Sequence, residues 1–299
     1  PFPVLELCGE QGSAKSSAQR HLRELIDPNK VPLRGRPKTV EDIFVGAANN
    51  WVVSFENLSH LMPEQQDALC TLSTGGGHAT RQFYTQGDEH VLECKRPVAL
   101  NGINPVASQP DLIERTISIE TPVIPADQRK DEQTLEAAWQ EDYPSIFGGL
   151  MDLFSEALRR LPDVELTHMH RMADYQLLGE AVALALGHPP GHFSELYSEA
   201  VSTGTDRGLE TFGIAHALQV LMADRHKPWE GTYLKLLSDL NALNNIDRSN
   251  WPRSPRHLTS QLKRISPGLR SRDVFVEQLG RSNQGSTLRI TTSFIERKK

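Results

Sequence analysis

A glycine-rich stretch near the start of the chain has the residue types and spacing of a phosphate-binding loop. The general pattern G-x-x-x-x-G-K-[ST] is met at Gly9, Lys15 and Ser16, with Ala14 in the place of the second glycine. In such a loop, backbone N–H groups and the positive helix end hold the β- and γ-phosphates, the lysine adds a point charge, and the serine hydroxyl binds Mg²⁺. A Gly- and Ser-rich turn with a chance lysine is the alternative. The residues predicted to bind ATP are Gly9, Glu10, Gln11, Gly12, Ser13, Ala14, Lys15, Ser16 and Ser17.

An apolar run at 51–55 ends in a carboxylate and an amide, Glu56 and Asn57. A buried parallel strand that brings an acid to its C-terminal end, beside a phosphate loop, holds Mg²⁺ and orients the attacking water. We therefore predict Glu56 and Ser16 as the Mg²⁺ ligands. Asn57 stands where many ATPases have a catalytic glutamate, so Glu56 has both roles, another acid enters, or hydrolysis is slow. A surface acid at a strand end is the alternative.

Two further polar residues lie at strand ends. Asn101 ends the apolar run 96–102, from which its amide can sense a γ-phosphate. Arg115 precedes the strand predicted at 116–120, from which it can reach the γ-phosphate of a neighbouring subunit and stabilise transition-state charge. Each is equally compatible with a turn-capping or salt-bridged residue. The predicted catalytic residues are Lys15, Glu56, Asn57, Asn101 and Arg115.

Alternating residues at 81–86 and 89–94, around Gly87-Asp88, predict a β-hairpin. Its predicted tip is acidic, which is poor chemistry for a phosphate backbone. Arg81 and His90 are the candidate DNA contacts of this hairpin, and packing between subunits is the alternative role.

The 299-residue length is enough for about two domains. The three cysteines lie far apart, which excludes structural zinc and a disulfide framework and indicates a reducing, cytoplasmic compartment. No segment approaches the roughly 20 apolar residues of a membrane span, so we expect no membrane association. A chain that starts with Pro1, almost directly on the strand before the loop, is expected to have lost an N-terminal region.

Charge is distributed unevenly between the two ends of the chain. The formal total is −6, but residues 247–299 carry 12 Lys and Arg against 4 Asp and Glu. That segment is thus +8, while residues 1–246 are −14. The asymmetry suggests that nucleic acid meets the C-terminal segment, with a merely solvated basic surface as the alternative.

The segment between these ends is predicted to be helical. Apolar residues recur at three- and four-residue spacing in 131–140, 146–161, 172–186, 193–203, 210–225 and 232–244. Arg171 is a candidate to reach nucleotide from this region. Four histidines raise the possibility of a metal site, but they bracket turns without nearby cysteines, so solvated histidines are favoured. They are His168, His170, His188 and His192.

The last segment has the pattern of a small winged-helix domain. A helix is expected to open at Ser254, and strands at 274–279 and 287–291 flank a polar wing at 280–286. Its cations are suited to duplex or fork phosphates, although such domains also dock proteins. The predicted DNA-binding residues are Arg256, Lys263, Arg264, Arg270 and Arg272, with Arg281 on the wing.

The order of phosphate loop, acid-ending strand, hairpin, Asn-ending strand and arginine before the last strand resembles the AAA+ core of superfamily 3 helicases and poxvirus-type primase-helicases. It is more similar to replicative ATPases of phages, plasmids and integrated mobile elements. Similar stretches are 26–29, 55–59, 72–77, 100–103, 110–115, 171–175, 179–180 and 251–254. The resemblance implies a homo-hexameric ring with ATP sites between subunits and hairpins that grip single-stranded DNA in a central channel.

The expected fold is therefore α/β: a P-loop AAA+ core with a parallel sheet at 1–125, a helical lid at 126–246 and a winged-helix-like DNA-binding domain at 247–299. The expected function is an ATP-dependent DNA helicase or translocase of a mobile-element replication system. A single-subunit P-loop phosphotransferase is a second possibility, but it needs an acceptor pocket, and the hairpin and basic tail argue against it. A third is an ATP-switched DNA-binding initiator or loader with weak hydrolysis.

Overall fold

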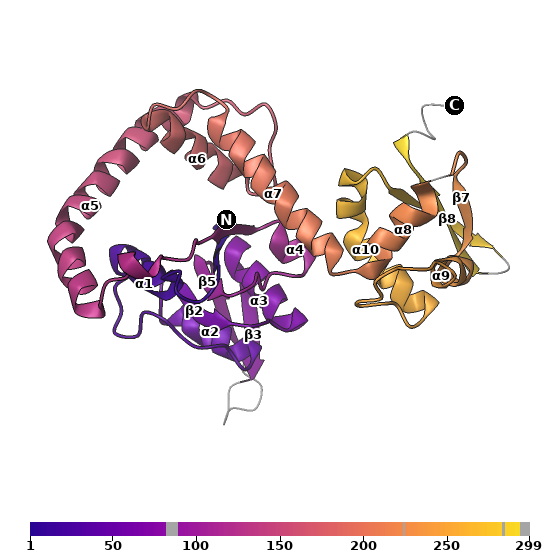
Figure 1. Ribbon diagram of the computed structural model, residues 1–299, viewed down its shortest axis with the longest axis horizontal. Helices are drawn as coiled ribbons and strands as arrows, with labels where there is room; N and C mark the ends of the chain where they lie inside the picture. The colour runs from indigo at the N-terminus through magenta and orange to yellow at the C-terminus, as the bar shows by residue number, and fades with distance from the viewer. Residues whose placement is uncertain (82–88, 224, 283–284, 294–299) are drawn as a thin grey trace. The chain divides into compact units, whose positions relative to one another are not determined.

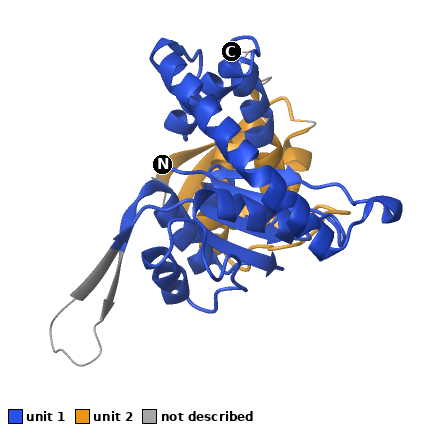
Figure 2. Ribbon diagram, turned by 90° about the vertical axis from the view of Figure 1, so that its left-hand side faces the viewer, with its two compact units in different colours: residues 1–202 blue, residues 203–299 orange. Residues whose placement is uncertain are grey.

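The computed structural model describes residues 1–81, 89–223, 225–282 and 285–293. It divides into two compact units, residues 1–202 and residues 203–299 (Figure 2). The first unit contains a parallel sheet and the second a small antiparallel sheet. No helix in these described ranges is both long and apolar enough to cross a membrane.

The sheet of the first unit has four parallel strands in the order β2-β5-β1-β6. These are β1 (Val4–Cys8), β2 (Val53–Leu58), β5 (Val98–Gly102) and β6 (Thr116–Glu120). Every residue of β5 is buried, as expected for a parallel strand covered on both faces. The α/β fold and the parallel sheet that the sequence predicted are thus confirmed.

Helices surround this sheet (Figure 1). They are α1 (Lys15–Ile26), α2 (Val40–Ala48), α3 (Pro63–Thr74) and α4 (Pro110–Ile113). Thr39 and Asp42 form a capping box that starts α2, and a proline at the first position starts α3. The apolar residues of α2 and α3 share one core with the strands. Ile43 of α2 and Leu69 of α3 are fully buried in it.

The expected hairpin is present as the antiparallel pair β3 (Gly76–Arg81) and β4 (Glu89–Cys94). Its first strand begins at Gly76 and ends at Arg81, where the sequence predicted the strand to begin. Residues 82–88, with the predicted turn at Gly87-Asp88, lie outside the described residues.

The helices that follow the sheet are α5 (Glu132–Arg160), α6 (Ala173–Ala185) and α7 (His192–Glu210), with short 3₁₀ turns η1 (Ala126–Gln128) and η2 (Leu161–Asp163). The sequence predicted two helices where α5 is continuous, and that prediction was wrong. Pro144 lies inside α5 and removes one backbone hydrogen bond. The helix continues because packing holds it on both sides of the proline. The Trp139 ring stacks 4.2 Å from that of His21 on α1, and Ala157 is fully buried on the part of α5 that packs against α6.

The second unit adds three helices and three strands: α8 (Gly213–Ala223), β7 (Trp229–Thr232), α9 (Tyr233–Asn241), α10 (Pro255–Ser271), β8 (Phe275–Ser282) and β9 (Gly285–Thr291). The strands form an antiparallel sheet in the order β7-β9-β8. The strand β7 was not predicted, since its four residues are too few to show a period. One apolar core joins residues on both sides of position 246, including Leu218, Leu236 and Leu262. Residues 203–246 are therefore part of the same compact unit as the basic segment.

Candidate functional site

The loop between β1 and α1 has the backbone conformation that its sequence pattern requires. Gly9, Gly12 and Ala14 have φ values of 151°, 83° and 56°. The left-handed conformation of Ala14 explains why the pattern usually has glycine there, because a side chain costs roughly 1–2 kcal/mol in it. A Cβ on Gly9 would lie 2.5 Å from the carbonyl oxygen of Thr121. The loop is thus fixed by the segment that follows β6.

Lys15 begins α1 and turns back across the loop. Its Nζ donates to the carbonyl oxygens of Gly9 and Glu10, each at 2.7 Å, and to Ser13 Oγ at 3.1 Å. This arrangement holds an ammonium group among the backbone groups that a phosphate would approach. The phosphate-binding role of Lys15 stays a prediction.

The strand order brings Glu56 and Asn101 to the same end of the sheet as the loop. Because β5 lies between β1 and β2, Asn101 lies between the loop and Glu56, with neighbouring strands about 4.8 Å apart. Asn101 is 2 % exposed, and its Nδ2 lies 3.5 Å from Ser16 Oγ. Glu56 is half-buried in the C-terminal half of β2. Carboxylate and hydroxyl oxygens are ligands that Mg²⁺ prefers, so Glu56 and Ser16 fit that ion.

The backbone conformation at position 57, and not the chemistry of its side chain, explains why an asparagine is present there. The β2–β5 register shifts between Phe55 and Leu58, and Asn57 has a φ of 53°. Asparagine tolerates this left-handed conformation better than most residues, and such bulges often lie beside active sites. The exposed Asn57 donates its backbone N–H to Asn101 Oδ1 at 2.8 Å. Its position thus anchors the Asn101 amide.

Arg129 also lies at the loop, and the sequence analysis did not single it out. The segment after β6 crosses the loop, since the backbone N–H of Ile124 donates to Gly12 O at 3.1 Å. Arg129 Nε donates to Ile124 O at 3.1 Å, and a Cβ on Gly12 would lie 3.0 Å from Arg129 Nη2. A second cation is therefore beside the loop. The only signal in the sequence is a basic residue shortly after the last core strand.

Arg115 lies at the opposite end of the sheet from the loop. Thr116 pairs with Val4, the first residue of β1, whereas the loop follows the last residue of β1. Arg115 is 8 % exposed, and its Nη1 lies 2.6 Å from Asp111 Oδ1. It does not approach the phosphate loop of its own chain.

Arg171 joins this cluster at the start of β6. Its Nη1 lies 2.7 Å from Asp111 Oδ1 and 2.7 Å from Glu114 Oε2, and its side chain is 43 % exposed. Burial acts to raise the pKa of Asp111, but the hydrogen bond and charge of Arg115, with the charge of Arg171, lower it overall. Arg171 lies with Arg115 and not at the loop.

In the second unit, α10 presents a basic face. Arg256, Lys263 and Arg270 are exposed and recur every seven residues, which is almost two helical turns. Arg264 is also exposed beside Lys263, and the sequence of α10 contains no Asp or Glu. The opposite face holds apolar residues of the core. These are Leu258, Leu262, Ile265 and Leu269.

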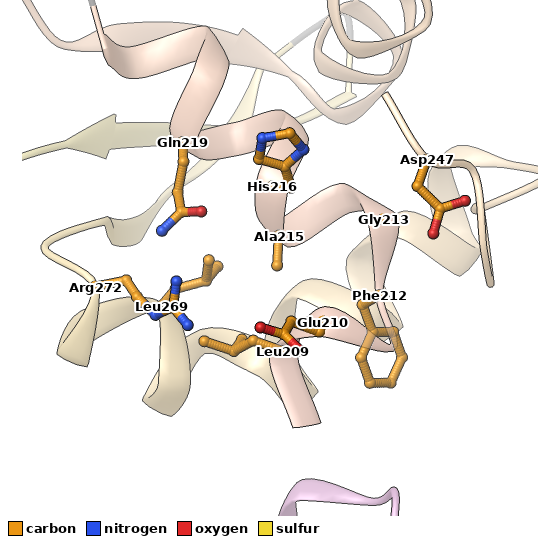
Figure 3. Close-up of a pocket in the computed structure, with 10 residues that line it drawn as sticks. All are labelled: Leu209, Glu210, Phe212, Gly213, Ala215, His216, Gln219, Asp247, Leu269 and Arg272. Atoms are coloured by element: carbon orange, nitrogen blue, oxygen red, sulfur yellow. The ribbon is translucent and has the colours of Figure 1, made fainter. Parts of the chain in front are cut away.

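Arg272 differs from these four cations. Its Nε lies 2.7 Å from Asp206 Oδ1, so its charge is paired. It lines a cavity of about 290 Å³, together with His216 and Gln219 of α8 (Figure 3). The structure thus separates Arg272 from the exposed face of α10.

The remaining candidates are three predicted DNA contacts and the histidines. The side chains of Arg81, His90 and Arg281 lie outside the described residues. The rings of His188 and His192 stack 4.4 Å apart. Within the described part of the chain, no group of three or more His, Cys, Asp or Glu side chains is arranged to hold a metal ion.

Family models match both units of the chain. Residues 1–188 match the model described as actinomycete integrative conjugative element replication protein, and residues 214–298 match the AICE RepA C-terminal domain. The first match lies within the first compact unit and the second within the other. No curated protein shows a significant match.

Proposed function

Because the chain belongs to the family of actinomycete integrative conjugative element replication proteins, we propose that it is an ATP-driven DNA helicase or translocase of that element's replication system. The observation that carries the proposal is the meeting of Lys15, Ser16, Glu56 and Asn101 at one end of a parallel sheet. A loop cation, a hydroxyl, a carboxylate and an amide are the groups that phosphoryl transfer from ATP requires.

Each group has a distinct part in this proposal. Lys15 and Arg129 would hold the phosphates, and Ser16 and Glu56 would hold Mg²⁺, which would supply positive charge to the β- and γ-phosphates. Asn101 directs an N–H toward the γ-phosphate. Glu56 also orients the attacking water, since Asn57 has no carboxylate to do so.

The site needs a second copy of the chain in this proposal. Arg115 lies at the far end of the sheet from its own loop, so the phosphate that it meets belongs to a neighbouring subunit. An arginine supplied in this way stabilises the transition-state charge. We therefore propose a homo-hexameric ring with shared ATP sites.

The second unit binds DNA in the same proposal. Its elements follow the order helix, strand, helix, helix, strand, strand, which we assign as a winged helix with α10 as its recognition helix. The four exposed cations of α10 contact phosphates of a duplex or fork. Because α10 contains no acid, its face does not repel the backbone.

One observation favours a second candidate function. Asn57 provides no carboxylate where a catalytic glutamate is common, and its backbone is used to hold Asn101. A chain of this kind binds ATP, hydrolyses it slowly and uses the nucleotide to control assembly on DNA. The alternative is therefore an ATP-switched initiator or loader.

Steady-state ATP hydrolysis by the purified chain, with and without single-stranded DNA, tests the proposal. Lys15→Ala is the matched blank, because it removes one loop cation without touching the sheet. Turnover that DNA stimulates and that is lost in Lys15→Ala supports the motor. ATP binding without turnover supports the initiator or loader. Equal turnover in both proteins, or no nucleotide binding by the native chain, contradicts the proposed site.

A further inference from the structure

Gln19 joins the phosphate-loop helix to two strands of the sheet. It lies on α1, and its side chain is 1 % exposed. The amide nitrogen donates to Ser54 Oγ at 2.8 Å and to the carbonyl oxygens of Phe55 and Ala99 at 3.1 Å each. Its amide oxygen accepts from Asn101 Nδ2 at 2.5 Å. One buried amide thus connects α1, β2 and β5.

Backbone groups fix the orientation of both amides in this network. The carbonyl oxygens of Phe55 and Ala99 can only accept, so the Gln19 atom that faces them must be nitrogen, and its oxygen faces Asn101. The backbone N–H of Asn57 can only donate, so the Asn101 atom that faces it must be oxygen. Neither side chain can flip without placing like groups against each other.

The orientation determines which group Asn101 presents to the loop. Asn101 Nδ2 carries two hydrogens, one of which goes to Gln19 Oε1, and the same nitrogen lies 3.5 Å from Ser16 Oγ. A donor therefore faces the phosphate side. A flipped Asn101 would turn its oxygen toward a phosphate, where two negative groups repel each other.

We propose that Gln19 is a positioning residue, which holds Asn101 with its amide nitrogen toward the γ-phosphate and so lets the site distinguish ATP from ADP. This inference rests on the proposed ATP site. It concerns the γ-phosphate alone, since the contacts of Lys15 with the loop do not involve Gln19.

Gln19→Met tests the inference, because methionine keeps the length of the side chain and removes its hydrogen bonds. We expect kcat to fall roughly 10- to 100-fold, the range seen when a partner of a catalytic ligand is removed. The Kd of ADP should stay within about twofold, while the Kd of a non-hydrolysable ATP analogue rises toward it, so that the preference for the analogue over ADP is lost. Asn101→Ala should behave in the same way, and the double variant should be no worse than Asn101→Ala alone.

Gln66→Met is the matched control. Gln66 is also a 1 % exposed glutamine that bridges two segments, with its nitrogen on Leu61 O and its oxygen accepting from the backbone N–H groups of Ser108 and Gln109. It shares no partner with Asn101. Gln66→Met should lower the melting temperature about as much as Gln19→Met does, with kcat and nucleotide preference unchanged.

Gln19→Leu is the second variant, for use if Gln19→Met does not fold. Leucine has no oxygen to accept from Asn101 Nδ2, so it cannot hold the Asn101 amide in place, and the preference for the ATP analogue should again be lost. If a folded Gln19 variant keeps kcat and the preference for the ATP analogue, while Asn101→Ala loses both, then Gln19 is not a positioning residue. The role of Asn101 would still stand. If the native chain binds neither nucleotide, or binds them as Lys15→Ala does, the proposed ATP site falls and the inference falls with it.

Discussion

The phosphate-loop site of the first unit and the basic helix of the second place their charged groups in different ways. At the loop, Lys15, Glu56, Asn101 and Arg129 come from four separate segments and meet because the strand order is β2-β5-β1-β6. On α10, the helical repeat alone places four exposed cations on one element. The first site depends on the sheet as a whole, whereas the second needs only that α10 be a helix with its apolar face buried.

Under the proposed function, the two regions also differ in whether one copy of the chain is sufficient. The cations of α10 are exposed together on a single chain. At the sheet, Arg115 lies at the end remote from the loop of its own chain. The comparison predicts that the second region acts alone and that the first requires a neighbour.

The largest expected effect comes from Arg115→Ala, which tests the need for a neighbour. Turnover should fall by roughly 10³-fold, the lower end of the range for an arginine that acts on transition-state charge. Mixing this variant with Lys15→Ala should restore part of the activity, because a mixed ring contains sites with one intact loop and one intact arginine. Hydrolysis by each variant and by the mixture is the measurement. No recovery would show that Arg115 does not act in trans.

A smaller effect is expected from replacing the four cations of α10 together with alanine. The slope of log K for DNA against log salt should decrease by roughly three to four, at about 0.9 for each lost phosphate contact. Binding titrations at several salt concentrations measure this slope. Arg272→Ala is the control, since its charge is already paired with Asp206. An unchanged slope in the fourfold variant would show that α10 does not contact DNA phosphates.

Arg129→Ala is expected to weaken ATP binding roughly 10-fold, because a hydrogen bond to a charged group contributes about 1.5–3 kcal/mol. Titration with a labelled ATP analogue measures the change. Lys130→Ala, which removes the adjacent exposed cation, should have less effect. Equal losses in the two variants would mean that only overall charge near the loop matters, not the contact at Gly12.

The smallest effect concerns Asp111, which pairs with Arg115 and Arg171. Its pKa is lowered in the folded chain, so its pair stabilises the fold above the ordinary value of 3.8 and ceases to do so as the pH falls through the lowered value. Asp111→Asn should therefore reduce the free energy of unfolding by less than about 1 kcal/mol at neutral pH and by nothing in acid. Denaturant titrations from neutral to acid pH measure the free energy of unfolding. Glu141→Gln, at an exposed position, is the control. An equal loss at all pH values would assign the effect to packing.

The secondary structure could be predicted where a period is long or a residue is diagnostic. The apolar runs of β1, β2 and β5 indicated buried parallel strands, and the spacing in α10 indicated an amphipathic helix. The pattern failed at β7, which is too short to show a period, and at Pro144, where packing on α1 and α6 maintains a helix that local preference would break.

The candidate site could be predicted only in part for a similar reason. Lys15 and Ser16 belong to a pattern with fixed spacing, so the pattern predicts them directly. Arg129 and Gln19 have no such spacing, since each reaches its partners through contacts between segments that lie far apart in the sequence. A local pattern contains no information about those contacts.

The sequence by itself determined the glycine-rich turn before α1, the α/β character of the first unit and the basic face of α10, because each depends on residues within one turn, strand or helix. Only the tertiary structure decided that Asn101 lies between the loop and Glu56, that Arg115 faces away from its own loop, and that Arg272 is paired while its neighbours are exposed. These relations follow from strand order and from packing between distant segments. The type of each side chain can be read from the local sequence. Which side chains come together depends on how the whole core packs.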